Sequence, residues 1–259
     1  LRRARPPVRA RTTRPPGIGV STDDPVVERA RPSPNIWRDP RVYETLNRAA
    51  DPDGLVAAAL DEVIDGTTVS TAVDVGCGTG YHLPMLAERA GTVIGVEPHA
   101  RLADAARRRV ERARLGSSVQ VERGLAERLP LPDASVDLAF SHWAYFWGPG
   151  CEPGLAEADR VLRTGGLQVA VDLDTCADVG YARWFRAGPD RPAAAATEAF
   201  FAEQGWTTRR LAVVWRFRRR SELADVLRIE FSPDVAAAAL AQTVGTTIAV
   251  PSVLRWRRR

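Results

Sequence analysis

The sequence predicts an α/β protein with a doubly wound, mostly parallel seven-stranded sheet and helices on both faces. Short runs rich in valine, isoleucine and leucine alternate with longer segments of helical periodicity along most of the chain. A glycine-rich turn at residues 76–80 joins the first such strand to the next helix. The 259 residues are enough for one sizeable α/β domain. Right-handed crossovers then place a crevice at the carboxyl ends of the strands.

The individual elements follow from the same periodicity. Strands are expected at residues 71–75, 92–96, 118–122, 135–140, 167–171, 209–217 and 246–256. Helices are expected at residues 41–50, 53–64, 81–90, 100–114, 152–162, 193–204, 221–229 and 233–242. Asp53 is placed to cap the helix that follows it, and the glycines at 165–166 suit a left-handed helix C-cap. The helices at 221–229 and 233–242 would either cover a pocket or form a homodimer contact.

Composition narrows the class of protein. The apolar share of 45% and the charged share of 26% are ordinary for a globular protein. No run of 18 apolar residues predicts a membrane span, and the basic N-terminus lacks the apolar segment of a secretory signal. We therefore expect a cytoplasmic protein without a membrane partner.

The cysteines and histidines predict no metal site. Cys77, Cys151 and Cys176 are widely spaced and form neither a disulfide framework nor a zinc pattern. Cys151 and Cys176 are interpreted as small buried residues. The chain has only three histidines, so a histidine-rich metal site is not expected either.

The basic character of the chain, a net charge of +4, is carried by arginine alone, since the sequence contains no lysine. This usage is typical of a GC-rich genome. Much of the excess charge lies at the two ends, in residues 2–14 and 255–259, and the body between them is not basic. The composition therefore argues against a nucleic-acid partner, although arginine-rich ends could guide RNA.

The glycine turn itself suggests a bound nucleotide or nucleoside. The sequence VDVGCGTG at residues 73–80 has the spacing G-x-G-x-G, whereas a dinucleotide fold shows G-x-G-x-x-G. Glycine allows a sharp turn and close approach of a ligand to the backbone. Asp74 precedes the first glycine by two residues, and Glu97 closes the second strand, where a carboxylate can accept hydrogen bonds from ribose hydroxyls.

Four segments in this order resemble the class I S-adenosylmethionine-dependent methyltransferases, which have a Rossmann-like fold. They are VDVGCGTG at 73–80, VIGVEP at 93–98, GLAERLPLPDASVDLAF at 124–140 and EADRVLRTGG at 157–166. Together they cover roughly residues 70–172 and are most similar to the subgroup that acts on small molecules.

The resemblance implies S-adenosyl-L-methionine as cofactor and assigns residues to it. Asp74 would lie near the methionine amino group, Glu97 would bind the ribose hydroxyls, and Pro98 and His99 would flank the adenine. The family's loop often reads G-D-A-E, and Leu125 stands at its aspartate position, which leaves the backbone of Ala126, or Glu127, to recognise the adenine amino group. The remaining residues expected to contact the cofactor are Gly76, Cys77, Gly78, Thr79, Gly80 and Ser141.

The candidate catalytic residue is His142, which follows the fourth predicted strand, at a position that faces the transferred methyl group in this fold. It would act as a base for an acceptor that must lose a proton, or it would pack against the cofactor. Trp143, Tyr145, Phe146 and Trp147 are expected partly to line an apolar acceptor pocket and partly to pack in the core. Residues Trp37, Tyr43 and Asn47 would form a lid over the site or a helix docked on the sheet edge.

These inferences define the expected organisation and function. Residues 1–34, rich in arginine and proline, are predicted to be a disordered tail. Residues 35–259 are predicted to form one methyltransferase domain, with N-terminal helices over 35–68, a cofactor-binding core over 69–172 and a substrate-side half over 173–259. The favoured function is methyl transfer to a small-molecule acceptor at oxygen, nitrogen or carbon. The alternatives are an RNA or protein methyltransferase, and a non-catalytic binding or scaffold protein with the same fold.

Overall fold

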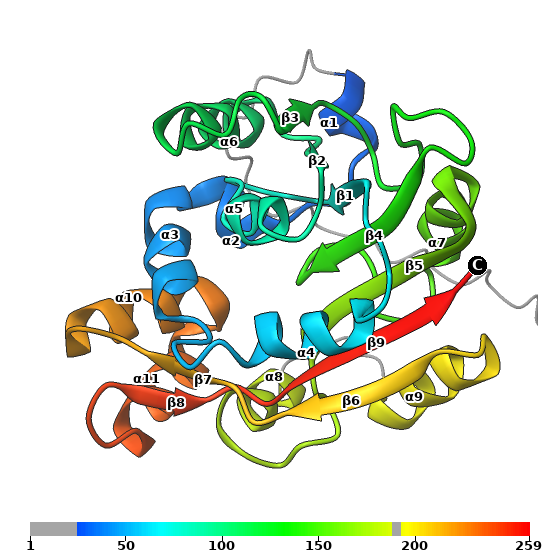
Figure 1. Cartoon of the computed structure of the whole chain (residues 1–259). Helices are drawn as coiled ribbons and strands as arrows, with labels where there is room; N and C mark the ends of the chain where they lie inside the picture. Colours follow the sequence, from blue (N-terminus) through cyan, green and yellow to red (C-terminus); the bar gives the residue numbers. More distant parts are fainter. Residues whose placement is uncertain (1–24, 188–192) are drawn as a thin grey trace, which may run out of the picture.

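A computed structural model describes residues 25–187 and 193–259 of the chain. Its main sheet contains seven strands in the order β3-β2-β1-β4-β5-β9-β6, and β7 pairs with β8 in a second, two-stranded sheet (Figure 1). The strands are β1 Thr71–Val75, β2 Thr92–Val96, β3 Val119–Glu122, β4 Val136–His142, β5 Leu162–Leu173, β6 Thr207–Leu211, β7 Val214–Arg216, β8 Thr247–Ala249 and β9 Ser252–Arg258.

The strand directions confirm the predicted fold class. The strands from β3 to β5 are all parallel, and β9 runs antiparallel to both of its neighbours, β5 and β6. The chain order reverses between β1 and β4, at the centre of the sheet. Ligands of doubly wound folds bind at the carboxyl ends of the strands at such a reversal.

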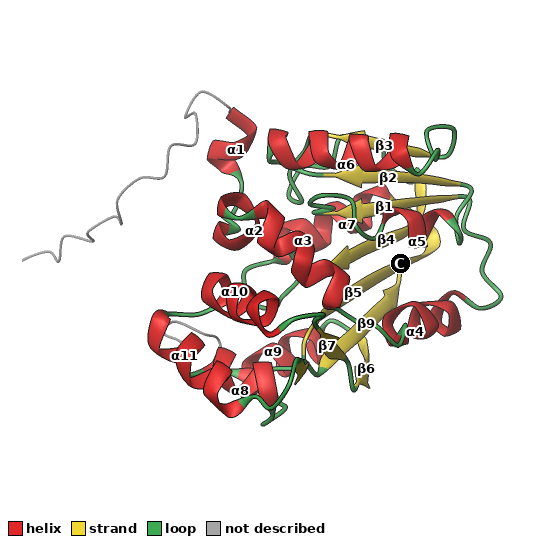
Figure 2. Cartoon of the chain, turned by 90° about the vertical axis from the view of Figure 1, so that its left-hand side faces the viewer, coloured by secondary structure: helices red, strands yellow, loops and turns green. Residues whose placement is uncertain are grey.

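Helices cover both faces of the sheet (Figure 2). Helices α4 (Leu55–Ile64), α5 (Leu83–Ala87) and α6 (Ala100–Arg112) form one apolar cluster with side chains such as Leu138 and Phe140. Helices α7 (Glu152–Val161) and α9 (Ala194–Glu203) form the other, with Val73 and Val75 of β1. Successive side chains of a strand point to opposite faces, which is why the buried strands contain apolar residues at nearly every position.

The remaining helices gather at the end of the sheet to which β4 points (Figure 2). Helix α3 contacts α2 and α10, and α10 packs on α11. Helix α10 therefore lies next to a helix that lines the cavities described below, but no residue of α10 or α11 is in the wall of those two cavities. The helices are α1 Pro25–Arg29, α2 Pro34–Arg38, α3 Pro40–Ala49, α8 Gly180–Arg186, α10 Arg220–Glu230 and α11 Pro233–Gln242. The sequence patterns did not predict α1, α2 or α8.

The two C-terminal strands predicted from the sequence are each divided. The expected strand over 209–217 splits into β6 and β7, and the expected strand over 246–256 splits into β8 and β9. The parts belong to different sheets. Pro251 separates β8 from β9, and a proline has no N–H group to continue a ladder. Hydrophobic runs do not show this change of sheet.

Two predicted helix caps are wrong. Asp51, not Asp53, caps α4, because its two carboxylate oxygens accept hydrogen bonds from the N–H groups of Leu55 and Val56, each at 2.8 Å. Helix α7 ends at Leu162 in an extended conformation rather than at a left-handed glycine. The register then shifts from Leu162 opposite Val136 to Leu167 opposite Leu138, so residues 163–166 form an irregularity in β5.

The described residues of both arginine-rich ends pack against the rest of the fold. Residues 1–24 lie outside the described part, but 25–34 contain helix α1, and Arg31 donates a hydrogen bond to the carbonyl of Gly150 at 2.6 Å, so the boundary at residue 34 is too late. At the other end, Arg255 is only 2% exposed, pairs with Glu198 and lies over the ring of Phe201. Its neighbours in β9 are paired as well, with Arg257 bonded to Asp159 at 2.6 Å. This end is a sheet strand rather than a free basic segment.

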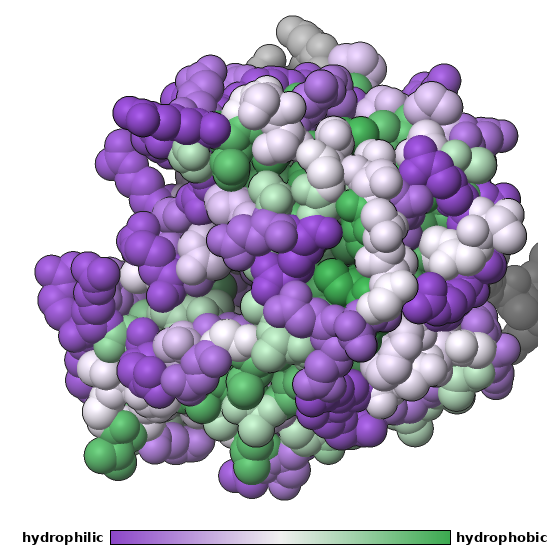
Figure 3. All heavy atoms as spheres, viewed as in Figure 1, coloured by the Kyte–Doolittle hydropathy of each residue, from purple (hydrophilic) through white to green (hydrophobic). Residues whose placement is uncertain are grey.

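The described surface is mostly hydrophilic, with apolar side chains in separate groups on the face seen in Figure 3. Among the described residues, no helix is long and apolar enough to cross a bilayer. Cys77 and Cys151 are buried, whereas Cys176 is exposed, contrary to its interpretation as a buried residue.

Candidate active site

Two adjoining cavities lie at the carboxyl ends of β1 and β4. The first, which we call the carboxylate cavity, measures about 180 Å³ and contains the glycine turn, Asp74 and Glu97 in its wall. The second, the aromatic cavity, measures about 190 Å³ and lies between α3, α4, the start of α5 and Trp215 of β7. The residues that line both cavities are Tyr43, Asn47, Tyr81, His82, His142 and Trp143.

The glycine turn brings the backbone to the edge of the carboxylate cavity. The N–H groups of Gly76 and Cys77 both donate to the carbonyl of Val96, at 2.8 and 3.1 Å, which ties the turn to β2. Gly76 has φ +79°, and a Cβ there would lie 2.6 Å from the Cβ of Ala144. Glycine is therefore required at this position by both conformation and space.

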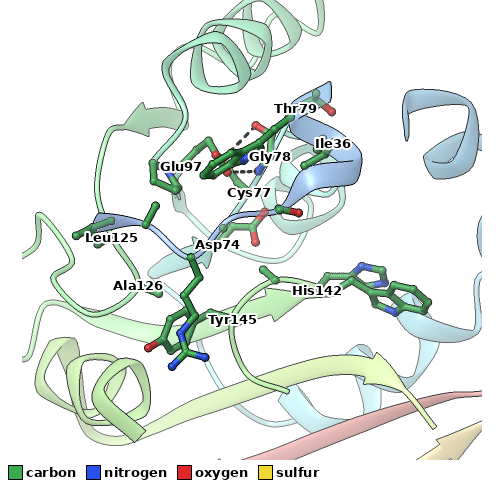
Figure 4. A pocket seen from close by; sticks show the side chains of 18 of the residues that line it. Ile36, Asp74, Cys77, Gly78, Thr79, Glu97, Leu125, Ala126, His142 and Tyr145 are labelled. Carbon is green, nitrogen blue, oxygen red and sulfur yellow. Dashed lines mark hydrogen bonds between the residues drawn. The ribbon is translucent and has the colours of Figure 1, made fainter. Parts of the chain in front are cut away.

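Two buried carboxylates face this cavity (Figure 4). Glu97 accepts hydrogen bonds from the N–H groups of Gly78 and His99, at 3.0 and 2.9 Å. Burial raises the pKa of Glu97 to about 7. Burial, and then the charge of Glu97, raise the pKa of Asp74 to about 7. A positive charge placed nearby would stabilise the ionised form of both carboxyl groups. The site is therefore suited to a positively charged ligand.

The structure brings together most of the residues assigned to the cofactor. Those that line the carboxylate cavity are Asp74, Gly76, Cys77, Gly78, Thr79, Glu97, Pro98, Leu125 and Ala126. Figure 4 shows Leu125 and Ala126 on the opposite side of the cavity from Ile36 and Thr79.

Gly80 and Ser141 are not brought into the cavity. A Cβ on Gly80 would lie 2.9 Å from Leu83, so this glycine allows close packing of the turn beneath α5 and α6. Ser141 is buried in the sheet and donates from its hydroxyl to the carbonyl of Val75 at 3.2 Å. Their expected contact with the cofactor is corrected accordingly.

His142 is the last residue of β4, so this strand ends two residues later than predicted. Its ring centroid lies 4.1 Å from that of His82, at the junction of the two cavities. Burial lowers the pKa of His142 well below its ordinary value and lowers that of His82 to about 4. Both imidazoles are therefore neutral near pH 7. Sequence reasoning missed His82, although it is one of only three histidines and stands two residues after the glycine turn.

Helices α2 and α3 cover the carboxylate cavity, as the lid interpretation expected for Trp37, Tyr43 and Asn47. The Thr79 hydroxyl donates to the carboxylate of Glu44 at 3.0 Å, and Arg109 of α6 forms an ion pair with the same carboxylate. Helix α3 is thereby tied directly to the glycine turn. The sequence pattern did not indicate this role of Glu44.

The aromatic residues after β4 divide between cavity and core, as predicted. The Trp143 ring lies 5.4 Å from that of Trp215, in the wall of the aromatic cavity. Tyr145 and Phe146 are buried in the core on the α7 face. The Tyr145 hydroxyl also donates a hydrogen bond to Glu127.

Comparison with known proteins agrees with this geometry. Residues 73–170 match the family described as "Methyltransferase domain". A malonyl-[acyl-carrier protein] O-methyltransferase from Serratia marcescens is 36% identical over 95 residues, which span 37% of this chain and 35% of that protein. The matched region thus spans about a third to a half of the length of the curated relatives.

Two solved structures have the same fold. A putative methyltransferase from Bacillus halodurans matches with a TM-score of 0.59 and 17% identity, over 78% of this chain and 97% of that one. Geranyl diphosphate C-methyltransferase from Streptomyces coelicolor, solved with Mg²⁺, geranyl diphosphate and S-adenosyl-L-homocysteine, matches with a TM-score of 0.52 and 17% identity, over 78% of each chain. The residues matched to this family, 73–170, include the glycine turn and both buried carboxylates, and the fold is the one that the solved structures share.

Proposed function

We propose that this chain is an enzyme that transfers the methyl group of S-adenosyl-L-methionine to a small-molecule acceptor. The observation that supports this most directly is the pair of buried carboxylates, Asp74 and Glu97, beside the glycine turn, in a cavity that adjoins a second one. Similar proteins include O- and C-methyltransferases of small or carrier-bound acceptors, which favours the same class here.

The carboxylate cavity fits this cofactor. Bound S-adenosylmethionine supplies an activated methyl group on a positively charged sulfur. Asp74, 2% exposed, makes no side-chain hydrogen bond or ion pair within the described part of the chain, so an ammonium group would satisfy it. Glu97 is already oriented by two N–H groups, and its remaining lone pairs can accept from ribose hydroxyls.

Recognition of the adenine is assigned to the backbone of Ala126. Leu125 offers no polar side chain at the position of the family's aspartate. Glu127 accepts a hydrogen bond from Tyr145 and lies 3.9 Å from the guanidinium of Arg31, so its carboxylate is already engaged. Of the two alternatives open from the sequence, the backbone is therefore the better supported.

His142 is proposed to accept the proton of the acceptor. Its imidazole is neutral and lies where the two cavities meet. A weakly basic imidazole is suited to take the proton once the new bond to carbon has begun to form, because the attacking group then becomes strongly acidic. The enclosed cavity walls hold the acceptor in line with the methyl group and exclude water.

The alternative of an RNA methyltransferase relied on arginine-rich ends that attract RNA. It loses its main support at the C-terminal end, because Arg255 and Arg257 form ion pairs within the fold. The scaffold alternative rested on Leu125, whose place in the cavity wall leaves the neighbouring backbone available.

Isothermal titration calorimetry with S-adenosylmethionine and S-adenosylhomocysteine tests the proposed function. We expect binding of both, weakened by Asp74→Asn and unchanged in Asp104→Asn, a control at an exposed position of α6 that pairs with Arg107. Absence of binding at millimolar ligand would overturn the proposal. Transfer of tritium from the labelled methyl group to a small acceptor would then complete the evidence.

A further inference from the structure

The aromatic cavity is a separate chamber beside the methyl-transfer site. Its apolar wall is formed by side chains from α3, α4, α5, the residue after β4 and the β6–β7 region, namely Leu46, Val56, Met85, Trp143, Val213 and Trp215. An apolar protein cavity of about 150 Å³ is known to hold a benzene molecule. The present volume of about 190 Å³ therefore admits a small molecule of one or two rings.

The charges around this cavity are unfavourable for an ionic ligand. Among the described residues that line it, none is arginine, and the chain contains no lysine. The carboxylate in its wall, Asp51, already accepts two hydrogen bonds from the N-terminus of α4. Arg109, which lies close enough to lower the pKa of His82, is ion-paired with Glu44. An anion in this cavity would lose its hydration without meeting a free positive charge.

Hydrogen-bonding groups concentrate at the end that adjoins the carboxylate cavity. His82, His142 and Asn47 line both cavities, so a ligand in the aromatic cavity meets them where the methyl group would arrive. A neutral imidazole nitrogen can accept a hydrogen bond from a hydroxyl group. The cavity thus combines an apolar, aromatic body with acceptors at one end, a pattern common in small-molecule sites.

We propose that the aromatic cavity binds the methyl acceptor and that this acceptor is an uncharged aromatic hydroxyl compound. This inference rests on the methyl-transfer function proposed above. A diphosphate acceptor, such as that named for the geranyl diphosphate enzyme of similar fold, would need a cation that the described wall of this cavity does not provide.

The reaction balances with the residues present. A lone pair of the acceptor hydroxyl oxygen forms the bond to the methyl carbon, the carbon–sulfur bond breaks, and its electron pair remains on sulfur as a neutral thioether. The hydroxyl proton passes to the imidazole of His142, which releases it to solvent. His82, whose tilted ring lies against that of His142, positions that imidazole.

The charge requirement is tested with two probes that share one ring system, 2-naphthol and 2-naphthoate. Both are titrated into the protein saturated with S-adenosylhomocysteine and, separately, into the free protein. We expect 2-naphthol to bind at least tenfold more tightly than 2-naphthoate and to receive tritium from methyl-labelled S-adenosylmethionine. Equal or tighter binding of 2-naphthoate would overturn the proposal.

The location is tested with adjacent alanines of α4. Ala57 lines the aromatic cavity, whereas Ala58 is exposed on the same helix. We expect Ala57→Phe to weaken 2-naphthol binding more than tenfold and to change S-adenosylhomocysteine affinity less than twofold, while Ala58→Phe changes neither. Unaltered 2-naphthol binding in Ala57→Phe would contradict the assignment. If Ala57→Phe does not fold, Met85→Trp fills the same cavity from α5, and we expect the same loss of 2-naphthol binding with unchanged S-adenosylhomocysteine affinity.

The two proposals fail in different ways. If S-adenosylhomocysteine binds and 2-naphthol does not, the acceptor assignment is wrong and the methyltransferase function stands. If S-adenosylhomocysteine does not bind, the function fails, and the titration of the free protein still decides whether the aromatic cavity accepts an uncharged ring.

Discussion

The two cavities differ in how the chain builds them and in the charges that they present. The two acids of the carboxylate cavity come from short contiguous segments at strand ends, and residues 74–79, 97–98 and 124–127 form one part of its wall. The aromatic cavity is assembled from α3, α4, the start of α5, the end of β4 and β7, which are spread over most of the described chain. A cofactor shared by a whole family can be bound by a local motif, whereas the acceptor site depends on how distant elements pack.

Their electrostatics differ in the same way. The wall of the carboxylate cavity contains two buried acids, Asp74 and Glu97. The junction with the aromatic cavity contains two neutral histidines. The first cavity is suited to a cation and the second to an uncharged molecule. Substitutions on each side should therefore separate cofactor binding from turnover.

The largest effect is expected for His142→Gln. Loss of a group that accepts the acceptor's proton should lower methyl transfer at saturating substrate by about 100-fold, at the low end for acid–base catalysis because this imidazole is a weak base. Cofactor affinity should stay within about twofold, since Asp74 and Glu97 are unchanged. Turnover and calorimetry together check this. A fall in affinity without a fall in saturated turnover would assign His142 to packing.

Glu97→Ala should affect the carboxylate cavity, and therefore cofactor binding rather than turnover. Removal of charge-assisted hydrogen bonds to the ribose should weaken S-adenosylmethionine binding by about 1.5–3 kcal/mol, or one to two orders of magnitude. Calorimetry provides the measurement. Glu122→Ala, at an exposed position of β3, serves as the control. Unchanged affinity would show that the ribose is held elsewhere.

Cofactor affinity should rise with pH. The pKa values of Asp74 and Glu97 are both raised to about 7, so protonation below that pH removes the negative charge that a cationic ligand requires. Between pH 6 and pH 8 we expect roughly a tenfold gain in affinity for each carboxylate that ionises. Titrations at a series of pH values measure it, and Asp74→Asn should flatten the profile. A pH-independent affinity would exclude these carboxylates as the cation site.

The ligand-free protein should show the opposite trend in stability. The pKa of Asp74 rises from 3.8, and that of Glu97 from 4.5, to about 7 on folding. The unfolded chain therefore releases these protons first, and the free energy of unfolding falls as the pH rises from about 4 to about 7. Thermal unfolding without ligand checks the sign. Saturation with S-adenosylmethionine should stabilise the protein more at pH 8 than at pH 6.

The smallest effect is expected at the hydrogen bond between Thr79 of the glycine turn and Glu44 of α3. Thr79→Val removes the hydrogen bond to Glu44 but leaves the Glu44–Arg109 ion pair. A net loss of about 0.5–1.5 kcal/mol should weaken cofactor binding by no more than about tenfold. Thr247→Val, at an exposed position of β8, is the matched control. An equal effect of both changes would show that Thr79 does not link α3 to cofactor binding.

The sequence predicted the sheet well where strand, turn and helix follow one another closely. The strands at 71–75 and 92–96 and the turn between them were correct because buried parallel strands are continuous apolar runs. The division of the C-terminal strands was missed, because the same apolar run continues while the chain moves from one sheet to the other. The helical cap of Asp51 was missed because its reach depends on the turn before α4.

The candidate site divides along the same line. Asp74, Glu97 and the glycines were identified because they are adjacent to strand ends in the sequence. His82, Trp215 and Glu44 were not identified. Their roles depend on contacts with His142, Trp143 and Thr79, which lie 35 to 72 positions away in the sequence. Gly80 and Ser141 were expected to contact the cofactor from their positions in the sequence. Both are instead packed in the interior of the fold, away from the cavity.

The position of β9 also affects the order in which the sheet can be completed. Among the described strands, β6 pairs with β9 alone, and Thr207 lies opposite Trp256 in that ladder. Strands β1 to β5 can associate as soon as they leave the ribosome, but β6 has to wait for the segment that follows α11. During synthesis, the cofactor half can thus become ordered while the C-terminal half still exposes an unpaired strand, and this nascent state is where we expect chaperones to act.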